Sequence, residues 1–323
     1  MTDTMLPAAC DLCPRACGAN RYAGKRGACG ADDKLMVARA ALHFWEEPPI
    51  SGTRGSGTVF FAGCPLRCSY CQNAVIAVGG AGAPIGVDRL ADICLELEGQ
   101  GALNVNFVTP TQYALQARAA VEKARALGLT VPVVWNTSGY ETVRSVRANA
   151  GVVDAYLTDF KYADPALAAR YSNAPDYPAV ALAALEAMVE EAGPPRFDEV
   201  DGERRLVGGV VVRHLMLPGA LEDSKRVVRL IRERFADSVL LSLMNQYTPV
   251  LPEAAASGDA RAAACLDRCP ELAHRVPDRE YELLLDFADA LGIEDYFWQE
   301  GGAAEDSFIP PFDLVGVHSG DSE

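Results

Sequence analysis

The sequence predicts an α/β fold: a partial, open (βα)6 barrel of the TIM type, with a small cysteine-rich module at its N-terminus. Two observations predict it. Six short apolar runs are rich in β-branched and aromatic residues, and most are followed by a segment with helical periodicity. Strand followed by helix, repeated along one chain, indicates a parallel sheet with right-handed crossovers. Six units are too few to close an eight-stranded barrel, so we expect it to stay open.

The expected strands are short apolar runs that read as buried. They are residues 58–63, 103–109, 131–136, 152–160, 210–217 and 239–244. The expected helices are residues 87–98, 113–127, 177–192, 221–235 and 279–291. Thr111 is a candidate N-cap for the second helix, and Gly292 is expected to stop the last one.

Composition divides the 323 residues into three parts: a cysteine-rich N-terminal metal-binding module (1–44), the barrel (45–300) and an acidic C-terminal tail (301–323) that we expect to pack loosely. No run of eighteen apolar residues occurs, and the N-terminus lacks the features of an export signal. The formal net charge of −15 disfavours non-specific binding to nucleic acid. We therefore expect a cytoplasmic protein without membrane spans.

Three cysteines follow the first expected strand within eight residues. Cys64, Cys68 and Cys71 form a C-x3-C-x2-C pattern. In a chain of this size, clustered cysteines are more typical of metal ligands than of disulfides. Three thiolates in one loop can hold three irons of a 4Fe-4S cluster and leave the fourth iron open. A closed zinc site would need a fourth ligand, which no nearby Cys or His supplies.

Polar residues follow each of the other expected strands, in the segments VTPTQY, NTSGYE, TDFKY, RHLMLPG and LMNQYTP. In a parallel barrel the carboxyl ends of the strands form one mouth, where the chemistry gathers. For any single segment, ordinary turn residues are an equally good interpretation. Together with the three cysteines, these segments predict one site at the mouth.

The three-cysteine segment, with Tyr70 before its last cysteine, resembles the signature of radical S-adenosylmethionine (radical SAM) enzymes. FFAGCPLRCSYCQN, including Asn73, resembles the corresponding segment of pyruvate formate-lyase activating enzymes. Over roughly residues 10–300 the chain is similar to an uncharacterised radical SAM group homologous to those activases. The segments that carry this are CDLCPRACGANR, EEPPISG, NVNFVTPT, NTSGYE, DFKY, RHLMLPG and LMNQYTP.

The resemblance implies an oxidoreductase with a 4Fe-4S cluster and SAM as cofactors. SAM would chelate the open iron, and an electron from a flavodoxin or ferredoxin would cleave it to methionine and a 5′-deoxyadenosyl radical that abstracts a substrate hydrogen. The substrate would be a partner glycyl-radical enzyme, as for the activases. A small molecule, a peptide or an RNA base stays open as an alternative, and a non-enzymatic metal-binding module is a third, less favoured hypothesis.

The resemblance also assigns cofactor contacts to residues in and after the first two expected strands. Tyr70 would lie near the adenine, although a core aromatic fits it equally well. Activases carry Gly-Gly-Glu-Pro after the second strand to bind the SAM amino group, and this chain lacks it. The amine contact would then use neutral oxygens of Asn106, Thr109 or Thr111, which are weaker acceptors than a carboxylate.

After the later expected strands, Asn136 and Thr137 match a family Asp-Thr. Asp159 and Lys161 match the Asp-x-Lys of the family. In the family, these positions contact SAM and a monovalent cation. Asn136 replaces the acid, which puts the cation site in doubt, and Asp159 and Lys161 could instead form a simple ion pair. Arg213 matches an arginine near the SAM carboxylate, which its fork can bind. His214 would point to the opposite face and be structural.

A second group of cysteines lies near the N-terminus. Cys10, Cys13, Cys17 and Cys29 follow C-x2-C-x3-C-x11-C in a glycine-rich stretch too poor in apolar residues to order itself. A metal is the most plausible source of order, and both zinc and a second iron-sulfur cluster fit four thiolates. Three other cysteines give weaker signals. Cys94 reads as a core residue, and Cys265 and Cys269 lie in a variable insertion where two ligands do not make a site.

Overall fold

A computed structural model describes residues 6–79, 81–299 and 310–318. In this part of the chain ten strands form one sheet, in the order β10-β9-β8-β6-β5-β4-β2-β1-β3, with β7 paired to β8 beside that path. The strands are β1 (Leu35–His43), β2 (Ser56–Phe61), β3 (Ala83–Ile85), β4 (Val105–Val108), β5 (Val133–Thr137), β6 (Ala155–Asp159), β7 (Arg196–Val200), β8 (Glu203–Leu215), β9 (Leu240–Met244) and β10 (Tyr296–Trp298).

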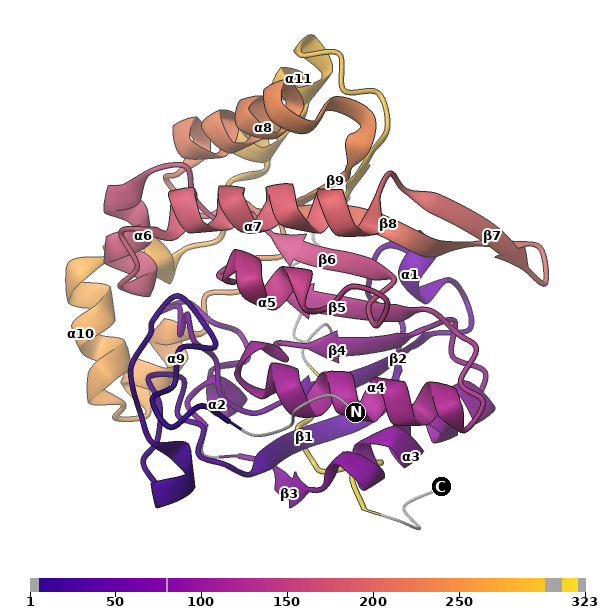
Figure 1. The fold of residues 1–323 in the computed structure, drawn as a ribbon. Helices are drawn as coiled ribbons and strands as arrows, with labels where there is room; N and C mark the ends of the chain where they lie inside the picture. The colour runs from indigo at the N-terminus through magenta and orange to yellow at the C-terminus, as the bar shows by residue number, and fades with distance from the viewer. Residues whose placement is uncertain (1–5, 80, 300–309, 319–323) are drawn as a thin grey trace.

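The predicted fold class is confirmed: the chain is an α/β protein with a partial, TIM-like barrel. All six expected strands are present, as β2, β4, β5, β6, β8 and β9, and neighbours among them pair in parallel. β10 adds a further parallel strand beside β9. In Figure 1 the arrowheads of β4, β5 and β6 point toward the side where the N-terminal segment, α2 and α9 lie. The site is therefore expected on that side.

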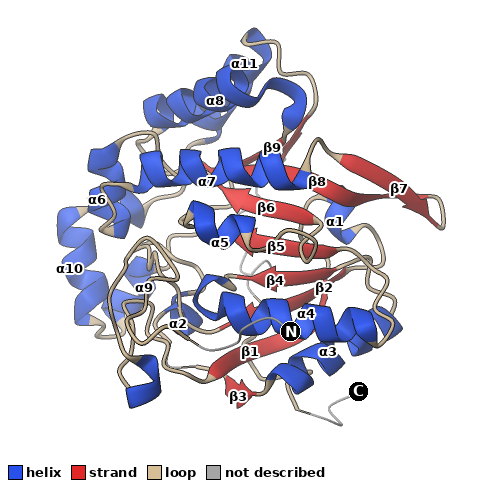
Figure 2. Ribbon diagram, in the orientation of Figure 1, coloured by secondary structure: helices blue, strands red, loops and turns tan. Residues whose placement is uncertain are grey.

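Helices cover one face of the sheet, where α3, α4, α5 and α7 lie in front of the strands (Figure 2). The α-helices are α1 (Pro48–Ser51), α2 (Ala74–Ala77), α3 (Val87–Gly99), α4 (Ala114–Ala126), α5 (Val143–Arg147), α6 (Pro165–Ser172), α7 (Tyr177–Ala192), α8 (Leu221–Phe235), α9 (Leu251–Ala256), α10 (Ala260–Arg268) and α11 (Asp278–Ala290). The helices expected at 177–192 and 221–235 match α7 and α8, and Gly292 follows α11 with φ 68°.

The main core lies between the sheet and these helices. Phe61, Phe107 and Trp135 form a row of edge-to-face rings across β2, β4 and β5, with ring centroids 5.4 and 6.5 Å apart. Helix α3 buries Leu90, Ile93, Cys94 and Leu97 on the predicted face. Cys94 is thus a core residue, as expected. Because every residue of β2 is buried, its second face must also be covered, and that face looks into the barrel.

Four strands were not predicted. β1 pairs antiparallel with both β2 and β3, β7 forms a hairpin with β8, and β10 closes the other edge. β3 and β10 have three residues each, too few to show a period of two. β1 falls in the part of the sequence assigned to the N-terminal module, yet its pairing makes it a strand of the barrel sheet. The division of the chain at residue 44 stays a prediction.

Thr111 is not the N-cap of α4, which corrects the sequence prediction. It opens a short 3-10 helix (Thr111–Tyr113), and Tyr113 precedes α4 without a side-chain cap. The Thr111 hydroxyl donates instead to Glu141 Oε1 at 2.5 Å. The hydroxyl of Thr111 is thus turned toward a buried carboxylate and does not accept from the amides at the start of α4.

The expectation of a loosely packed tail is wrong for residues 310–318. Leu314 N donates to Ala38 O and Ala40 N donates to Val315 O, so this segment runs along β1, and Val317 is fully buried. Residues 301–309 and 319–323, which the same prediction covered, lie outside the described residues. The insertion that carries Cys265 and Cys269 folds as α9, α10 and a 3-10 helix (Pro270–Ala273), with both thiols buried.

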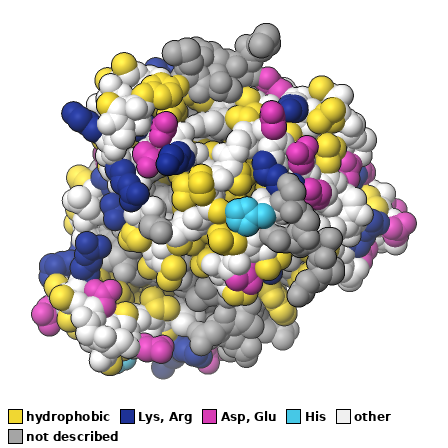
Figure 3. All heavy atoms as spheres, turned by 90° about the horizontal axis from the view of Figure 1, so that it is seen from below, with side chains coloured by type: hydrophobic (Ala, Val, Ile, Leu, Met, Phe, Trp, Pro, Cys, Tyr) yellow, Lys and Arg dark blue, Asp and Glu magenta, His cyan; other side chains and the backbone are white. Residues whose placement is uncertain are grey.

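Within the described ranges, no helix is both long and apolar enough to cross a lipid bilayer. Figure 3 shows the molecule from below, where basic and acidic side chains are interspersed among hydrophobic ones. Non-specific binding to nucleic acid needs a concentrated basic surface instead. The exclusion of nucleic acid stays a prediction from the net charge.

Candidate functional site

The loop after β2 carries Cys64, Cys68 and Cys71, and all three line one cavity. Gln112 fixes the start of this loop, because its side-chain amide donates to the carbonyls of Ala62 and Gly63 at 3.1 and 2.9 Å. The structure therefore brings the three thiols to one wall at the carboxyl end of the parallel strands.

Most of the other predicted contacts line the same cavity. They are Tyr70, Asn73, Thr109, Asn136, Thr137, Asp159, Lys161 and Arg213. Two predicted residues do not line it. Asn106 is fully buried, and its amide donates to Glu46 Oε1 at 3.1 Å. Thr111 is buried, and its hydroxyl donates to Glu141 Oε1.

The donor set fits a cluster with a polar organic ligand. Burial raises the pKa of the Cys64 thiol to about 11, and burial together with the charge of Cys68 raises that of Cys71 to about 12. Iron binding must therefore displace protons from both thiols. On the same cavity, Ser138 Oγ and Arg213 Nε are buried without a hydrogen-bond partner among the described residues. These two orphaned groups can meet a polar ligand.

Arg213 is the centre of a buried group of charges. Its Nη1 donates to Glu46 Oε2 at 2.8 Å, and its Nη2 donates to Asn136 Oδ1 at 2.8 Å. Its Nε lies 3.9 Å from Glu47 Oε1 and 3.8 Å from Asp159 Oδ1. Burial opposes the charge, but the surrounding carboxylates hold the pKa of Arg213 above its usual range. The guanidinium is thus charged and fixed in orientation.

Glu46 and Glu47 are site residues that the sequence analysis did not single out, although they open the segment EEPPISG. They follow β1, and Glu46 lines the cavity while its Oε1 accepts hydrogen bonds from Asn106 and Asn136. Glu47 is buried, which raises its pKa although Arg213 acts in the opposite direction. Two adjacent acids before a Pro-Pro pair were the available signal, but only the antiparallel course of β1 brings them to the cavity.

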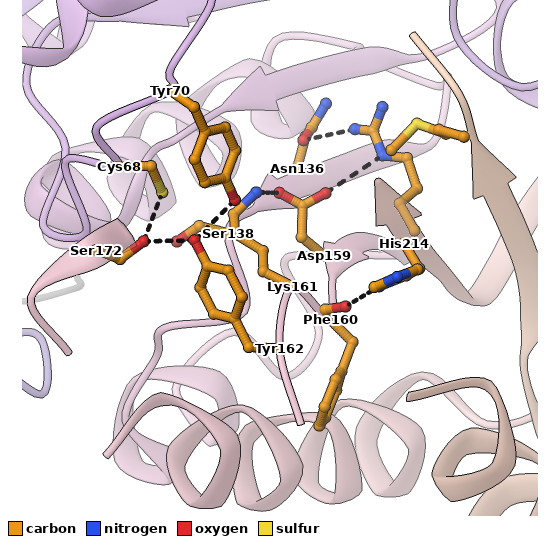
Figure 4. Close-up of polar contacts among 12 residues, drawn as sticks. Cys68, Tyr70, Asn136, Ser138, Asp159, Phe160, Lys161, Tyr162, Ser172 and His214 are labelled. Atoms are coloured by element: carbon orange, nitrogen blue, oxygen red, sulfur yellow. Dashed lines mark hydrogen bonds and ion pairs between the residues drawn. The ribbon is translucent and has the colours of Figure 1, made fainter. Parts of the chain in front are cut away.

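Asp159 and Lys161 form an ion pair, with Lys161 Nζ 2.5 Å from Asp159 Oδ2 (Figure 4). Their side chains are only 21% and 14% exposed, so this is not a solvated surface pair. Burial alone would lower the pKa of Lys161, but Asp159 and the Cys68 sulfur hold it above its ordinary value. The pair lines the cavity together with the three cysteines.

A chain of hydroxyl groups leads from Tyr70 to one of the thiols (Figure 4). The Tyr162 hydroxyl donates to the Tyr70 hydroxyl at 2.8 Å and lies 2.7 Å from Ser172 Oγ, which donates to Cys68 Sγ at 3.1 Å. Tyr70 is 5% exposed and also packs edge-to-face on Tyr171. The structure thus gives Tyr70 a place in the core and on the cavity wall at once.

The prediction that His214 is structural is met in part: Nδ1 has a partner, while Nε2 is buried without one among the described residues. Its Nδ1 hydrogen-bonds to the carbonyl of Phe160 at 2.8 Å, and the ring points away from the cavity side chains in Figure 4. Burial lowers its pKa to about 4. The imidazole is therefore neutral at ordinary pH and does not line the cavity.

The N-terminal cysteines lie against the loop of the first three. Cys10, Cys13 and Cys29 are buried and Cys17 is exposed. Arg15, another residue that the sequence did not single out, donates from Nε to Pro65 O at 2.9 Å and from Nη2 to Ser172 O at 2.8 Å. Among the described residues, no three His, Cys, Asp or Glu side chains are arranged to hold a single metal ion.

Comparison with known proteins gives limited similarity. No protein-family model matches the chain. It is 28% identical over 251 residues to "Uncharacterized protein MJ0674" of Methanocaldococcus jannaschii, an alignment that covers 74% of this chain and 66% of the relative. The match thus spans just under two thirds of that relative's length.

Two solved structures align with part of the chain. A radical SAM methyltransferase from Sphaerobacter thermophilus aligns with a TM-score of 0.47 and 14% identity, over 76% of this chain and 67% of that one. SuiB of Streptococcus suis, bound to the precursor peptide SuiA, aligns with a TM-score of 0.47 and 13% identity, over 74% and 47% of the two chains. TM-scores below 0.5 and identities below 15% carry no conclusion about function, which therefore rests on the cavity and its side chains.

Proposed function

We propose that this chain is a radical SAM enzyme that holds a 4Fe-4S cluster on Cys64, Cys68 and Cys71. The observation that carries the proposal is the placement of these three thiols on one cavity with Asn136, Asp159, Lys161 and Arg213, at the mouth of a partial parallel barrel. Three thiolates leave one iron of such a cluster open to a ligand. When bound, the cluster and SAM supply an electron-driven cleavage that yields a 5′-deoxyadenosyl radical.

The chain's own residues would bind and orient SAM. The positively charged guanidinium of Arg213 would bind the SAM carboxylate. Hydrogen bonds to Glu46 and Asn136 fix the orientation of that guanidinium. Among the described residues, Glu46 and Asp159 are the carboxylates that line the cavity. Both are better acceptors for an ammonium group than the hydroxyl of Thr109. We infer that one of them takes the place of the glutamate in the Gly-Gly-Glu-Pro segment, which this chain lacks after its second expected strand.

Shielding of the radical from unintended hydrogen donors is the second task of the protein, because a primary carbon radical attacks nearly any C–H bond that it meets. Tyr70, Phe60 and Leu66 line the cavity and are at most 6% exposed. They form an apolar part of the wall on the side of the cysteines. The cofactors supply the radical chemistry, while the chain orients the substrate and shields the radical.

The test is cleavage of SAM by protein reconstituted with iron and sulfide under anaerobic conditions and reduced with dithionite. We expect 5′-deoxyadenosine without added substrate, and none from a Cys71→Ala variant prepared in the same way. If the iron-loaded, reduced wild-type protein yields no 5′-deoxyadenosine, the proposal fails.

For the substrate, we propose a glycine of a partner glycyl-radical enzyme, on the strength of the resemblance to activases. We also propose a low-potential flavodoxin or ferredoxin as electron donor and the cytoplasm as the compartment. A glycyl radical detected on the partner by electron paramagnetic resonance (EPR) would support activation. Its absence, with SAM cleavage intact, would favour modification of a small molecule, a peptide or RNA.

A further inference from the structure

The outer edge of β1, on the side away from β2, is covered along only part of its length. β3 pairs with residues 35–37. The C-terminal segment covers the next part, where Ala40 N donates to Val315 O at 2.9 Å. At Leu42, and at Phe44 just after the strand, no hydrogen bond from another described residue reaches this edge. β1 therefore ends in a short stretch of open sheet edge, with which a further strand can pair.

The backbone of Leu42 faces this open side. In an antiparallel pair, alternate residues turn their amide and carbonyl groups to the same side, so Leu42 faces the same way as Ala40. The opposite strand agrees, because Gly57, the register partner of Leu42, donates its N–H to Asn104 O at 2.9 Å, toward β4. Leu42 and Gly57 are thus a pair without mutual hydrogen bonds. One donor and one acceptor of Leu42 are left for another chain segment.

A groove runs beside this edge and joins the cavity of the candidate site. Leu42 lines the groove. Four further lining residues, His43, Trp45, Phe60 and Pro310, also line the cavity that holds the three cysteines. A segment that pairs with Leu42 therefore follows one continuous wall into the candidate site.

The groove suits an extended polypeptide better than a small molecule. The rings of His43 and Phe60 meet edge-to-face with centroids 6.0 Å apart, and Phe44 is 48% exposed, so the wall offers contacts to apolar side chains. Arg39 also lines the groove, but it is paired with Asp313 at 2.6 Å. A polypeptide can in addition pair its own backbone with the open edge, as in other proteins that bind a peptide by adding a strand to a sheet.

We propose that the edge of β1 at Leu42 and Phe44 binds an extended polypeptide segment as an added strand, and that this segment belongs to the substrate. The role as substrate rests on the proposed function. Backbone hydrogen bonds to Leu42 fix the register of the segment, and the groove receives its side chains. The wall shared by His43 and Trp45 leads the next residues to the cavity.

The binding arm uses a phage-displayed library of random dodecapeptides, selected on the full-length protein. The affinity of a selected peptide is then measured by fluorescence anisotropy. Leu42→Pro removes the outward N–H, which an edge strand tolerates, and should weaken binding about tenfold or more. Leu42→Val keeps the N–H and should leave the affinity nearly unchanged. Failure to select a peptide, or equal affinities of Leu42→Pro and wild type, would overturn the site.

A second probe keeps the test independent of the folding of Leu42→Pro. The selected peptide is synthesised again with N-methyl groups on alternate backbone nitrogens, which blocks strand pairing and leaves every side chain in place. In one of the two possible phases of methylation, binding to the wild-type protein should weaken about tenfold or more. Undiminished binding of both methylated peptides would show that the groove does not act by strand addition.

Hydrogen exchange at the Leu42 amide distinguishes the possible occupants of the edge. We expect fast exchange in the free protein at every protein concentration, and slow exchange when the selected peptide is bound. Protection that rises with protein concentration would assign the edge to a second copy of the chain. Protection at every concentration would show that the chain covers its own edge. Either result would overturn the proposal.

The substrate arm uses the selected peptide made from fully deuterated amino acids, with iron-loaded, reduced protein and SAM. Abstraction breaks a C–D bond of the peptide and forms a C–D bond at the 5′ carbon, so we expect deuterium in 5′-deoxyadenosine. Product without deuterium, at saturating peptide, would overturn the substrate role. Absence of any 5′-deoxyadenosine would instead refute the proposed function and with it the substrate role, while the binding result would stand.

Discussion

Arg213 is the single residue on which the charge balance of the cavity depends. It is 12% exposed and faces three carboxylates, those of Glu46, Glu47 and Asp159. A buried carboxylate has lost its hydration, and without a counter-charge no attraction compensates for that loss. The residue is therefore needed for folding as well as for any ligand that it binds.

Arg213→Ala should lower the free energy of unfolding by about 3–5 kcal/mol, because it leaves buried carboxylates unpaired. Urea denaturation at neutral pH measures this. Arg232→Ala is the control, since Arg232 pairs with an Asp237 that is 96% exposed, and it should cost less than about 1 kcal/mol. Equal losses in the two variants would contradict the account of the buried charges.

His214 gives the molecule a pH dependence whose sign follows from its burial. Its pKa is about 4 in the folded chain, against about 6.5 in the unfolded one. The unfolded state therefore takes up the proton first, so stability is full above pH 6.5 and falls as the pH drops toward 4. The loss from this one group is about 3 kcal/mol at pH 4.

The test compares urea unfolding of the wild type and His214→Asn from pH 7 to pH 4. The Asn amide can still donate to Phe160 O but does not titrate, so the variant should lose about 3 kcal/mol less over this range. Parallel curves for the two proteins would show that His214 is not the group responsible.

Ser172 is the residue through which the hydroxyl chain reaches a candidate iron ligand. Its Oγ donates to Cys68 Sγ at 3.1 Å. Hydrogen bonds to cysteine sulfur stabilise the reduced, more negative form of an iron-sulfur cluster. Ser172→Ala should therefore shift the midpoint potential of the first cluster to a more negative value, as followed by EPR during redox titration.

Ser69→Ala serves as the control for this shift. Ser69 lies in the same loop, but its Oγ has no hydrogen-bond partner among the described residues. The control should leave the potential unchanged. A shift in both variants, or in neither, would mean that the Ser172 contact does not tune the cluster.

At the scale of elements, Gly63 joins β2 to the cysteine loop. It has φ 85°, and a Cβ at this position would lie 2.8 Å from Cys29 O. Two effects therefore oppose a side chain at this position: left-handed backbone strain, and a clash with the backbone of the N-terminal segment that carries Cys29. The close approach of two loops depends on this one residue.

Gly63→Ala should lower the free energy of unfolding by about 2 kcal/mol or more, and Gly128→Ala by only about 1 kcal/mol. Gly128 is the matched control because it has φ 113° with nothing within 4 Å of a built Cβ, so it isolates strain from the clash. Urea denaturation compares the two. A smaller loss at Gly63 would contradict the close docking of the module.

Elements with a strong local signal could be predicted from the sequence, and elements defined by their partners could not. β2 and β4 to β6 are apolar runs between polar ends, so they were found. β1 contains Arg39 and three alanines, weak strand formers, and it becomes a strand because β2 and the segment near residue 314 lie on its two sides. The edges of the sheet were missed for this reason.

At the scale of the whole molecule, the C-terminal segment ties distant parts of the chain together. Arg89 donates to the carbonyls of Gly316, Val317 and His318, and Arg39 pairs with Asp313 at 2.6 Å. The segment also covers part of the outer edge of β1, where unpaired backbone groups would otherwise invite association.

Truncation before residue 310 should lower the free energy of unfolding by about 3 kcal/mol, which combines lost burial of Val317 with lost acceptors of Arg89. The midpoint of thermal unfolding should fall by several degrees, as measured by calorimetry. Truncation before residue 319 is the control and should leave that midpoint nearly unchanged. Equal effects would show that the packed segment adds no stability.

The candidate site followed from the sequence where its residues are consecutive or stand at strand ends. Cys64, Cys68 and Cys71 share one loop, and Asn136, Asp159 and Arg213 stand at the ends of parallel strands that must meet. Glu46 and Arg15 could not be foreseen, because they reach the site only through the course of β1 and the docking of the N-terminal module. Such contacts arise from tertiary structure, so the segments EEPPISG and CDLCPRACGANR did not show where these side chains point.

The most direct measurement of the central claim is the EPR spectrum of the reduced, iron-loaded protein before and after SAM is added. The account predicts that SAM changes the spectrum of the cluster on Cys64, Cys68 and Cys71, because it binds the iron that no protein thiolate holds. In a Cys10→Ala/Cys13→Ala background, which removes two of the N-terminal thiols, the change should persist. A spectrum that SAM leaves unaltered in both proteins would contradict the claim.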